Sequence, residues 1–276
     1  MISDKAIVEK GAKLGSGVVI EPFAYVGSGV ELGDNCVVKS GAKLVGNTKI
    51  GENSKIYSYA IIGEGCQDIG HKPSGAESVI IGKNSVIREF ATINSGTFKN
   101  ENCDGSTKIG DNAFIMAYCH IAHDCKVGNN IIFANNATLA GHVEIGDFTV
   151  VGGLTPIHQF VRIGEGCMIA GASGVSQDIV PFCLAEGNRA YIRGLNVVGL
   201  RRRFNKEVID EIEYEKMIYT GPVDYYFDYK LGKLKWRSIK FIFETHDKPP
   251  WCFIATILSN KNIYGNARKR EKGLYI

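Results

Sequence analysis

Residues 13–44 read KLGSGVVIEPFAYVGSGVELGDNCVVKSGAKL, and an apolar residue occupies every sixth position of this stretch. The same spacing extends on both sides, through Val8, Leu14, Ile20, Val26, Leu32, Val38, Leu44, Ile50, Ile56 and Ile62. A period of six fits neither an α-helical turn nor a coiled-coil heptad, but it fits a short strand followed by a corner. Three such units close a triangular coil of about 18 residues, so the sequence predicts a mainly β solenoid.

Two interruptions divide this ladder of apolar residues. It resumes in a shifted frame at Ile81, Ile87 and Ile93, and again at Ile109, Ile115, Ile121, Val127, Phe133, Leu139, Ile145, Val151, Ile157, Ile163, Ile169 and Val175. The interruptions, near residues 67–78 and 98–107, predict loops that leave the solenoid, where such proteins often carry their function.

Most of the eight cysteines stand four positions after a ladder residue, where a narrow coil needs a small side chain. These are Cys36, Cys66, Cys119, Cys125 and Cys167. The chain has no CxxC pair and no metal-ligand spacing. We therefore predict buried thiols, with no disulfide framework and no metal site.

A chain of 276 residues, 45% hydrophobic and 22% charged, can bury one large domain plus an appendage. We predict a β-helix over 1–188 and a smaller, mostly helical region over 189–276, with helices from about Asn205 and over Tyr225 to Phe243. The C-terminal region has 18 basic and 10 acidic side chains, against 14 and 19 before it, which favours an acidic partner. Without a leader or a long apolar run, we expect a soluble cytoplasmic protein, not an integral membrane protein and not a nucleic-acid binder.

Four of the six histidines, His120, His123, His142 and His158, fall within one short stretch. Such a cluster serves acid–base chemistry or metal binding. With a coil of about 18 residues, His123, Gly141 and Gln159 should lie in one column. An imidazole beside a glycine amide is suited to proton abstraction next to an oxyanion donor.

Three segments carry a specific resemblance: HIAHDC at 120–125, NNATLAGH at 135–142 and GGLTPIHQF at 152–160. They resemble the UDP-N-acetylglucosamine 3-O-acyltransferase family of lipid A biosynthesis, and the likeness runs to about Arg203. The resemblance implies a left-handed parallel β-helix built from hexapeptide repeats and a homotrimer. It also implies transfer of a long 3-hydroxyacyl chain from acyl carrier protein to position 3 of UDP-N-acetylglucosamine, with no cofactor except the phosphopantetheine on the donor protein.

The resemblance also implies roles for single residues. His123 would be the general base, Asp124 its orienting partner, and the Gly141 amide the oxyanion donor. Gly171 would leave the acyl groove open for a long chain. The expected substrate-binding residues are Gln67, Asp68, His120, His142, His158, Gln159, Asn196 and Arg202.

The sequence departs from the family pattern at three places, of which the third is the tail beyond Phe204. Ile69-Gly70-His71 replaces the usual Leu-Lys-Tyr, and Asn94-Ser95 replaces His-Arg, which leaves open whether the acceptor atom at position 3 is oxygen or nitrogen. Three alternatives remain from the residues alone: another β-helix acyltransferase that uses coenzyme A, a γ-type carbonic anhydrase with zinc between subunits, and a non-catalytic scaffold.

Overall fold

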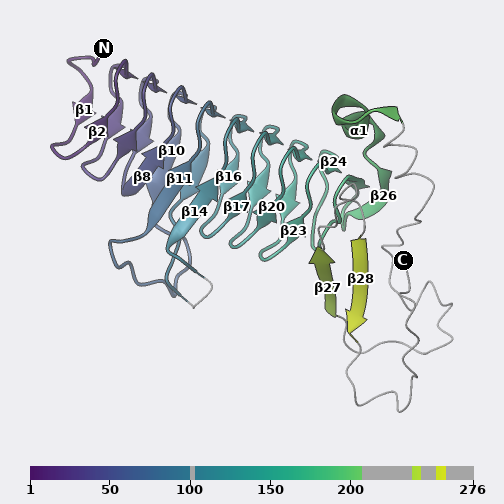
Figure 1. Ribbon diagram of the computed structural model, residues 1–276. Coiled ribbons are helices and arrows are strands. Elements are labelled where there is room, and N and C mark those ends of the chain that lie inside the picture. Colours follow the sequence, from purple (N-terminus) through teal and green to yellow (C-terminus); the bar gives the residue numbers. More distant parts are fainter. Residues whose placement is uncertain (100–102, 207–237, 244–252, 259–276) are drawn as a thin grey trace, which may run out of the picture. The chain divides into compact units, whose positions relative to one another are not determined.

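The computed structural model describes residues 1–99, 103–206, 238–243 and 253–258. Residues 1–200 form one compact unit, in which the chain winds through three parallel sheets (Figure 1). Up to the twenty-fourth strand, consecutive strands belong to different sheets, and neighbouring strands of one sheet are three places apart in the sequence. The coil is therefore a triangular prism, and we call its sheets the first, second and third face.

The strands of each face are short, and all but two of the neighbouring pairs stack without a register shift. The first face contains β1 (Ile7–Val8), β4 (Tyr25–Val26), β7 (Lys43–Leu44), β10 (Ile61–Glu64), β13 (Thr92–Asn94), β16 (His120–Ile121), β19 (Thr138–Leu139) and β22 (Pro156–Ile157). The second face contains β2 (Lys13–Leu14), β5 (Glu31–Leu32), β8 (Asn47–Ile50), β11 (Ser78–Ile81), β14 (Ser106–Ile109), β17 (Lys126–Val127), β20 (Glu144–Ile145) and β23 (Arg162–Ile163). The third face contains β3 (Val19–Ile20), β6 (Val37–Val38), β9 (Lys55–Ile56), β12 (Val86–Ile87), β15 (Phe114–Ile115), β18 (Ile132–Phe133), β21 (Val150–Val151), β24 (Met168–Ile169), β25 (Cys183–Glu186) and β26 (Tyr191–Leu195).

The ladder residues form the core of the prism. All except Val175 are the second residue of a two-residue strand or an inward residue of a longer one. From Ile20 onward they are all buried, and Phe133 is among the largest fully buried side chains. Cys36, Cys119, Cys125 and Cys167 are also buried, as predicted. Cys66 is only half-buried, because it lies beyond β10, where the chain has already left the coil.

Both interruptions of the repeat are loops between strands. The first loop, residues 65–77, joins β10 to β11, and the second loop, residues 95–105, joins β13 to β14. Both connect the first face to the second, so they leave the prism along the same edge (Figure 1). We call this line of turns the first edge.

The edge between the second and third faces carries a ladder of asparagines. Asn84, Asn112 and Asn130 all adopt positive φ angles of 55–56°. The Asn84 amide donates to Asn112 Oδ1 at 3.2 Å, and the Asn112 amide donates to Asn130 Oδ1 at 3.0 Å. Asparagine suits these corners because it tolerates the left-handed conformation and bonds to the next coil.

Replacing Asn112 by alanine should lower the free energy of unfolding by about 1–2 kcal/mol, because alanine is strained at positive φ. It also loses both ladder hydrogen bonds. Replacement by glycine should cost less, since glycine accepts this φ angle. Urea unfolding of both variants tests this, and an alanine variant as stable as the glycine variant would contradict it.

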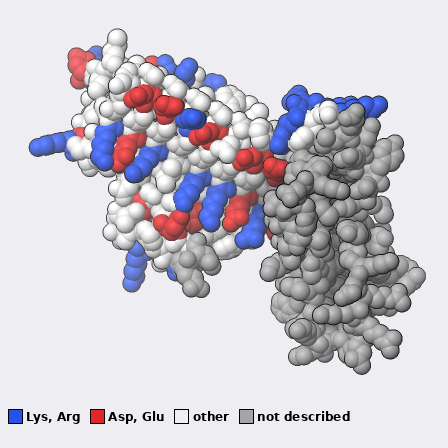
Figure 2. Space-filling view, in the orientation of Figure 1, with Lys and Arg blue, Asp and Glu red and all other residues white. Residues whose placement is uncertain are grey.

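Basic and acidic side chains form ion pairs between coils on the second face. Glu31 lies 2.9 Å from Lys13 and 3.5 Å from Lys49, and Glu144 lies 3.4 Å from Arg162. Figure 2 shows such mixed rows of charge over the coils. Because these pairs are well exposed, each contributes little to stability.

The last coil ends in an antiparallel pair, β25 with β26, and the short helix α1 (Val197–Arg203) follows. The boundary predicted between 188 and 189 falls in the turn between these strands. A second unit begins at Arg201 and contains β27 (Ser238–Phe243) antiparallel to β28 (Phe253–Leu258). No helix in the described ranges has the length and apolar character needed to cross a bilayer.

Two predictions concern the tail. The helix expected over Tyr225 to Phe243 is wrong at Ser238–Phe243, which is a strand. This segment is rich in isoleucine and phenylalanine, which favour strands. The helix expected from about Asn205 lies mostly outside the described residues, as does the rest of the first prediction up to residue 237.

Candidate functional site

The first edge brings the predicted column together. β16, β19 and β22 stack in register, with His120 opposite Thr138 and Thr138 opposite Pro156. The turns after these strands carry His123, Gly141 and Gln159, which therefore occupy the same corner of successive coils. Backbone hydrogen bonds tie these turns together, from His142 N to His123 O at 3.0 Å and from Phe160 N to Gly141 O at 3.1 Å.

His123 and Asp124 form a hydrogen-bonded pair in the first of these turns. His123 Nδ1 lies 2.8 Å from Asp124 Oδ2, and the two side chains are 15% and 5% exposed. Asp124 adopts a φ angle of 60°, which turns its carboxylate back toward the second loop, where Thr97 donates its N–H and its hydroxyl at 2.8 and 2.7 Å.

Burial would raise the pKa of Asp124, but the hydrogen bonds from His123 and Thr97 outweigh burial and hold this pKa below its usual value. The carboxylate is therefore ionised and can only accept hydrogen bonds. It follows that a neutral His123 carries its proton on Nδ1 and exposes an unprotonated Nε2. This is the arrangement of a general base with a fixed tautomer.

Gly141 lies directly against the imidazole of His123. A Cβ atom at Gly141 would stand 2.6 Å from both Cε1 and Nε2 of that ring, so any other residue would force the ring to shift. The φ angle of Gly141 is not positive, and close approach is the reason for glycine here. Within the described part of the chain, the Gly141 N–H donates to no protein acceptor. A backbone donor is thus available beside Nε2.

The other histidines surround this pair. The His142 ring meets the His123 ring edge-on at 4.9 Å and stacks on Phe160 at 4.5 Å. His120 Nδ1 lies 2.7 Å from Thr92 Oγ1. Burial lowers the pKa of both His120 and His142, which favours their neutral forms. His158 is exposed on the next coil, with Nδ1 3.1 Å from Gln159 O.

The first loop supplies Asp68, which forms an ion pair with Lys99 of the second loop. The bond from Lys99 above all, and more weakly the charge of His123, lowers the pKa of Asp68. Asp68 is therefore within electrostatic reach of the histidines. Gln67 beside it is exposed. Sequence reasoning did not find Lys99.

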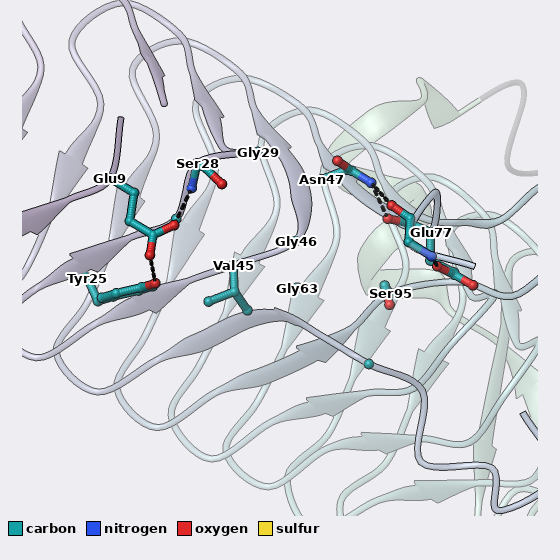
Figure 3. A pocket seen from close by; sticks show the side chains of 13 residues that line it. Glu9, Tyr25, Ser28, Gly29, Val45, Gly46, Asn47, Gly63, Glu77 and Ser95 are labelled. Atoms are coloured by element: carbon teal, nitrogen blue, oxygen red, sulfur yellow. Dashed lines mark hydrogen bonds between the residues drawn. The ribbon is translucent and has the colours of Figure 1, made fainter. Parts of the chain in front are cut away.

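Glu77 holds the first loop in shape. Its carboxylate accepts the N–H groups of Ser74 and Gly75 at 2.7 and 2.8 Å, and it lies 3.4 Å from His71 Nε2. The Ser74 backbone bond, ahead of other hydrogen bonds and against burial, lowers the pKa of Glu77 to about 2. Figure 3 shows Asn47 of β8 reaching the Glu77 backbone, where it donates to Glu77 O at 3.1 Å.

Replacing Glu77 by alanine should release residues 66–76 and speed their hydrogen exchange at least tenfold, because several hydrogen bonds of about 1 kcal/mol are lost. Hydrogen exchange of the loop tests this. Glu52→Ala is a matched control for removal of a glutamate, because among the described residues the Glu52 carboxylate makes no hydrogen bond or ion pair with either loop. Unchanged exchange in the Glu77 variant would contradict the assignment.

A hollow lies on the same edge, toward the N-terminus from the first loop (Figure 3). It is lined by Gly29, Gly46 and Gly63, which have no side chains, and by Glu9. The Glu9 carboxylate accepts hydrogen bonds from Tyr25 Oη at 2.5 Å and from Ser28 N at 2.9 Å. None of the predicted site residues lines it.

Three predicted site residues lie elsewhere. Asn196 caps the start of α1: its Oδ1 accepts the Gly199 N–H at 3.1 Å, and its amide donates to Gly166 O at 2.9 Å. Gly166 lies between β23 and β24, on the edge between the second and third faces. Gly171 follows β24 on the edge between the third and first faces, and it is exposed. Arg202 lies in the last turn of α1.

The second loop adds residues that sequence reasoning did not find. Thr97 binds Asp124, and the Cys103 thiol lies 3.9 Å from His142 Nδ1. Cys103, Asp124 and His142 are grouped closely enough to share a metal ion. No periodic signal marks these positions, because a loop leaves the repeat that allows residues to be aligned between coils.

Comparisons with known proteins agree with this geometry. Residues 11–46 and 106–141 match the family model described as bacterial transferase hexapeptide (six repeats). The solved UDP-N-acetylglucosamine acyltransferase from Campylobacter jejuni is 65% identical, with a TM-score of 0.74, and the match covers 77% of this chain and 81% of that one. The chain belongs to the UDP-N-acetylglucosamine acyltransferase family.

Other members of the UDP-N-acetylglucosamine acyltransferase family are similar over comparable lengths. A structure from Bacteroides fragilis is 33% identical, with a TM-score of 0.75, over 84% of this chain and 92% of that one. The fold shared with these structures is the left-handed parallel β-helix, so the predicted family and fold class are confirmed.

A curated relative from Campylobacter concisus, named acyl-[acyl-carrier-protein]--UDP-N-acetylglucosamine O-acyltransferase, is 70% identical over 146 residues. This match covers 53% of the chain and 55% of the relative, so the chain spans about half the length of the curated relatives it matches.

The C-terminal segment is similar to another family. Residues 194–263 match the model described as UDP-galactopyranose mutase. This match begins in β26 and covers the tail that resembled the acyltransferases least in sequence. We assign no activity from it, because it lies outside the histidine-bearing coils.

Proposed function

We propose that this protein transfers a long (R)-3-hydroxyacyl chain from acyl carrier protein to position 3 of UDP-N-acetylglucosamine or its 3-amino analogue, the first step of lipid A biosynthesis. The observation that carries the proposal is the contact between His123 and Gly141, which sets an unprotonated imidazole nitrogen beside a backbone donor. Family membership and the names of the relatives support the substrates.

The reaction needs no covalent enzyme intermediate. The position-3 oxygen or nitrogen attacks the thioester carbon while His123 Nε2 accepts its proton, and Asp124 stabilises the resulting imidazolium. The carbonyl oxygen gains negative charge, which the Gly141 N–H stabilises. The carbon–sulfur bond then breaks, and the imidazolium returns its proton to the phosphopantetheine thiolate. The new bond is an ester or an amide according to the acceptor.

Asn94, beside Ser95, fits either an oxygen or a nitrogen as the sugar atom that receives the acyl group. The Asn94 side chain is buried, and its amide donates to Gly65 O at 2.7 Å, at the start of the first loop. Its Oδ1 has no hydrogen-bond partner among the described residues. Asn94 Oδ1 can only accept hydrogen bonds, and a sugar hydroxyl and a sugar amine can both donate to it.

A homotrimer is part of the proposal. Within one chain, His123, Asn196 and Gly171 lie on three different edges of the prism. If all three act on one substrate, a second copy must supply some of them. Prisms packed side by side, with the first edge of one chain against its neighbour, would do so. Light scattering that gives a monomer at assay concentration would contradict the trimer.

The direct test incubates the protein with 3-hydroxyacyl carrier protein and either UDP-N-acetylglucosamine or its 3-amino analogue, and measures the acylated sugar nucleotide. We expect product with one or both acceptors, and faster transfer of long than of short acyl chains, because Gly171 leaves space. One parallel assay replaces the donor with acyl-coenzyme A, and another measures the dehydration of bicarbonate. Activity with either of these and none with the carrier protein would favour the corresponding alternative. A cytoplasmic location stays a prediction.

A further inference from the structure

Three potential metal ligands of different kinds converge beside the proposed base. Cys103 Sγ lies 3.9 Å from His142 Nδ1, and His142 Nδ1 lies 3.8 Å from Asp124 Oδ2. All three ligand atoms lie within 4.8 Å of one another. Ligand atoms around a tetrahedral zinc ion stand about 3.3–3.6 Å apart, given bonds of about 2.0–2.3 Å. Small rotations of the side chains would therefore close the site.

The ligand types select the metal. A thiolate, an imidazole and a carboxylate suit Zn²⁺, whereas Mg²⁺ and Ca²⁺ prefer oxygen ligands alone. Cys103 and His142 are half-buried and Asp124 is buried, so the ion would be partly shielded from water. Three protein ligands leave a fourth position for water or for a substrate group.

Zinc would compete with the machinery of acyl transfer. Asp124 Oδ2 already accepts hydrogen bonds from His123 Nδ1 at 2.8 Å and from the Thr97 hydroxyl at 2.7 Å. An ion on this oxygen must displace one of these donors. Loss of the His123 bond frees the ring to rotate, so that Nε2 is no longer held against Gly141.

We propose that Cys103, Asp124 and His142 bind one Zn²⁺ ion, and that bound zinc inhibits acyl transfer by withdrawing Asp124 from His123. Binding releases the Cys103 thiol proton to solvent. The inhibition rests on the proposed function, but the binding does not. The site was not expected from sequence, because Cys103 belongs to a loop and has no metal-ligand spacing to the histidines.

The binding test uses chelator-treated protein and ZnCl2 in calorimetry, with Co²⁺ absorption as a second probe. We expect about one zinc per chain and a sulfur-to-cobalt charge-transfer band. Cys103→Ala should weaken zinc binding at least tenfold and remove the band, since even the loss of an outer partner costs about 10- to 100-fold in affinity. Cys66→Ala, which alters a half-buried cysteine of the first loop, should change neither.

The inhibition test titrates zinc into the acyl-transfer assay. Wild type should lose activity at the zinc concentration where it binds, and Cys103→Ala should need at least tenfold more zinc while keeping its activity in zinc-free buffer. Unchanged zinc affinity in Cys103→Ala, or no binding to wild type, would overturn the site. Binding without inhibition would overturn the second half of the proposal. A protein that binds zinc but transfers no acyl group would count against the proposed function alone.

Discussion

Replacing His123 by alanine should reduce kcat for acyl transfer by about 10³-fold, within the 10²- to 10⁴-fold range typical for removal of a general base. The expected loss is large because no other described group combines an unprotonated nitrogen with the Gly141 contact. KM should change little if the imidazole acts mainly in the transition state. Steady-state kinetics with purified donor and acceptor give both constants.

The fold should survive this change. The His123 side chain lies in a turn on the surface of the prism, outside the apolar core. Ser28→Ala is a matched control, because Ser28 lies at the same corner position of an earlier coil on the same edge. We expect normal activity and melting temperature for the control. A His123 variant with nearly wild-type kcat would remove the proposed base.

Replacing Gly141 by alanine should lower kcat by about 10²-fold, the usual cost of moving a catalytic group by about 1 Å. The new Cβ would stand 2.6 Å from Cε1 and Nε2 of His123, so the ring must move away from the backbone donor. The hydrogen bond from His123 Nδ1 to Asp124 should be strained at the same time. Kinetics of the variant, with its circular dichroism, test this prediction.

Gly27 offers the control for added volume. It lies on the same edge, its φ angle is not positive, and a Cβ there would meet Leu44 O at 3.4 Å, an ordinary contact. Gly27→Ala should keep activity within about twofold. If Gly141→Ala were as active as Gly27→Ala, the close packing of ring and backbone would have no catalytic importance.

The solenoid could be predicted because one rule repeats along the sequence. Each ladder residue, such as Phe133, must be apolar since the interior of the prism is narrow and closed. The same periodicity let His123 and Gly141 be aligned before any coordinates, because a constant coil length converts sequence distance into position. Local pattern and tertiary structure agree here, so the prediction needed no knowledge of loops.

The rest could not be derived in this way. Thr97, Lys99 and Cys103 meet the histidines through a loop, whose return path depends on its own contacts and not on the repeat. Asn196 was expected to bind substrate, and within this chain its side chain caps α1. A substrate contact by Asn196 remains a prediction that involves a neighbouring chain.

The secondary structure of the C-terminal tail could not be predicted from local sequence pattern. Ser238–Phe243 was predicted as helix from apolar and basic residues, but its strand forms by pairing with Phe253–Leu258, which local sequence does not reveal. The similarity of residues 194–263 to UDP-galactopyranose mutase was also not anticipated. The departure from the acyltransferase pattern after Arg203 was the available signal.

The most direct test of the account is a crystal structure with the acylated sugar nucleotide bound. We predict His123 Nε2 within about 3 Å of the position-3 oxygen or nitrogen, and Gly141 N within about 3 Å of the acyl carbonyl oxygen. An acyl group bound at the first edge but out of reach of both atoms, or bound at another edge of the prism, would contradict the central claim.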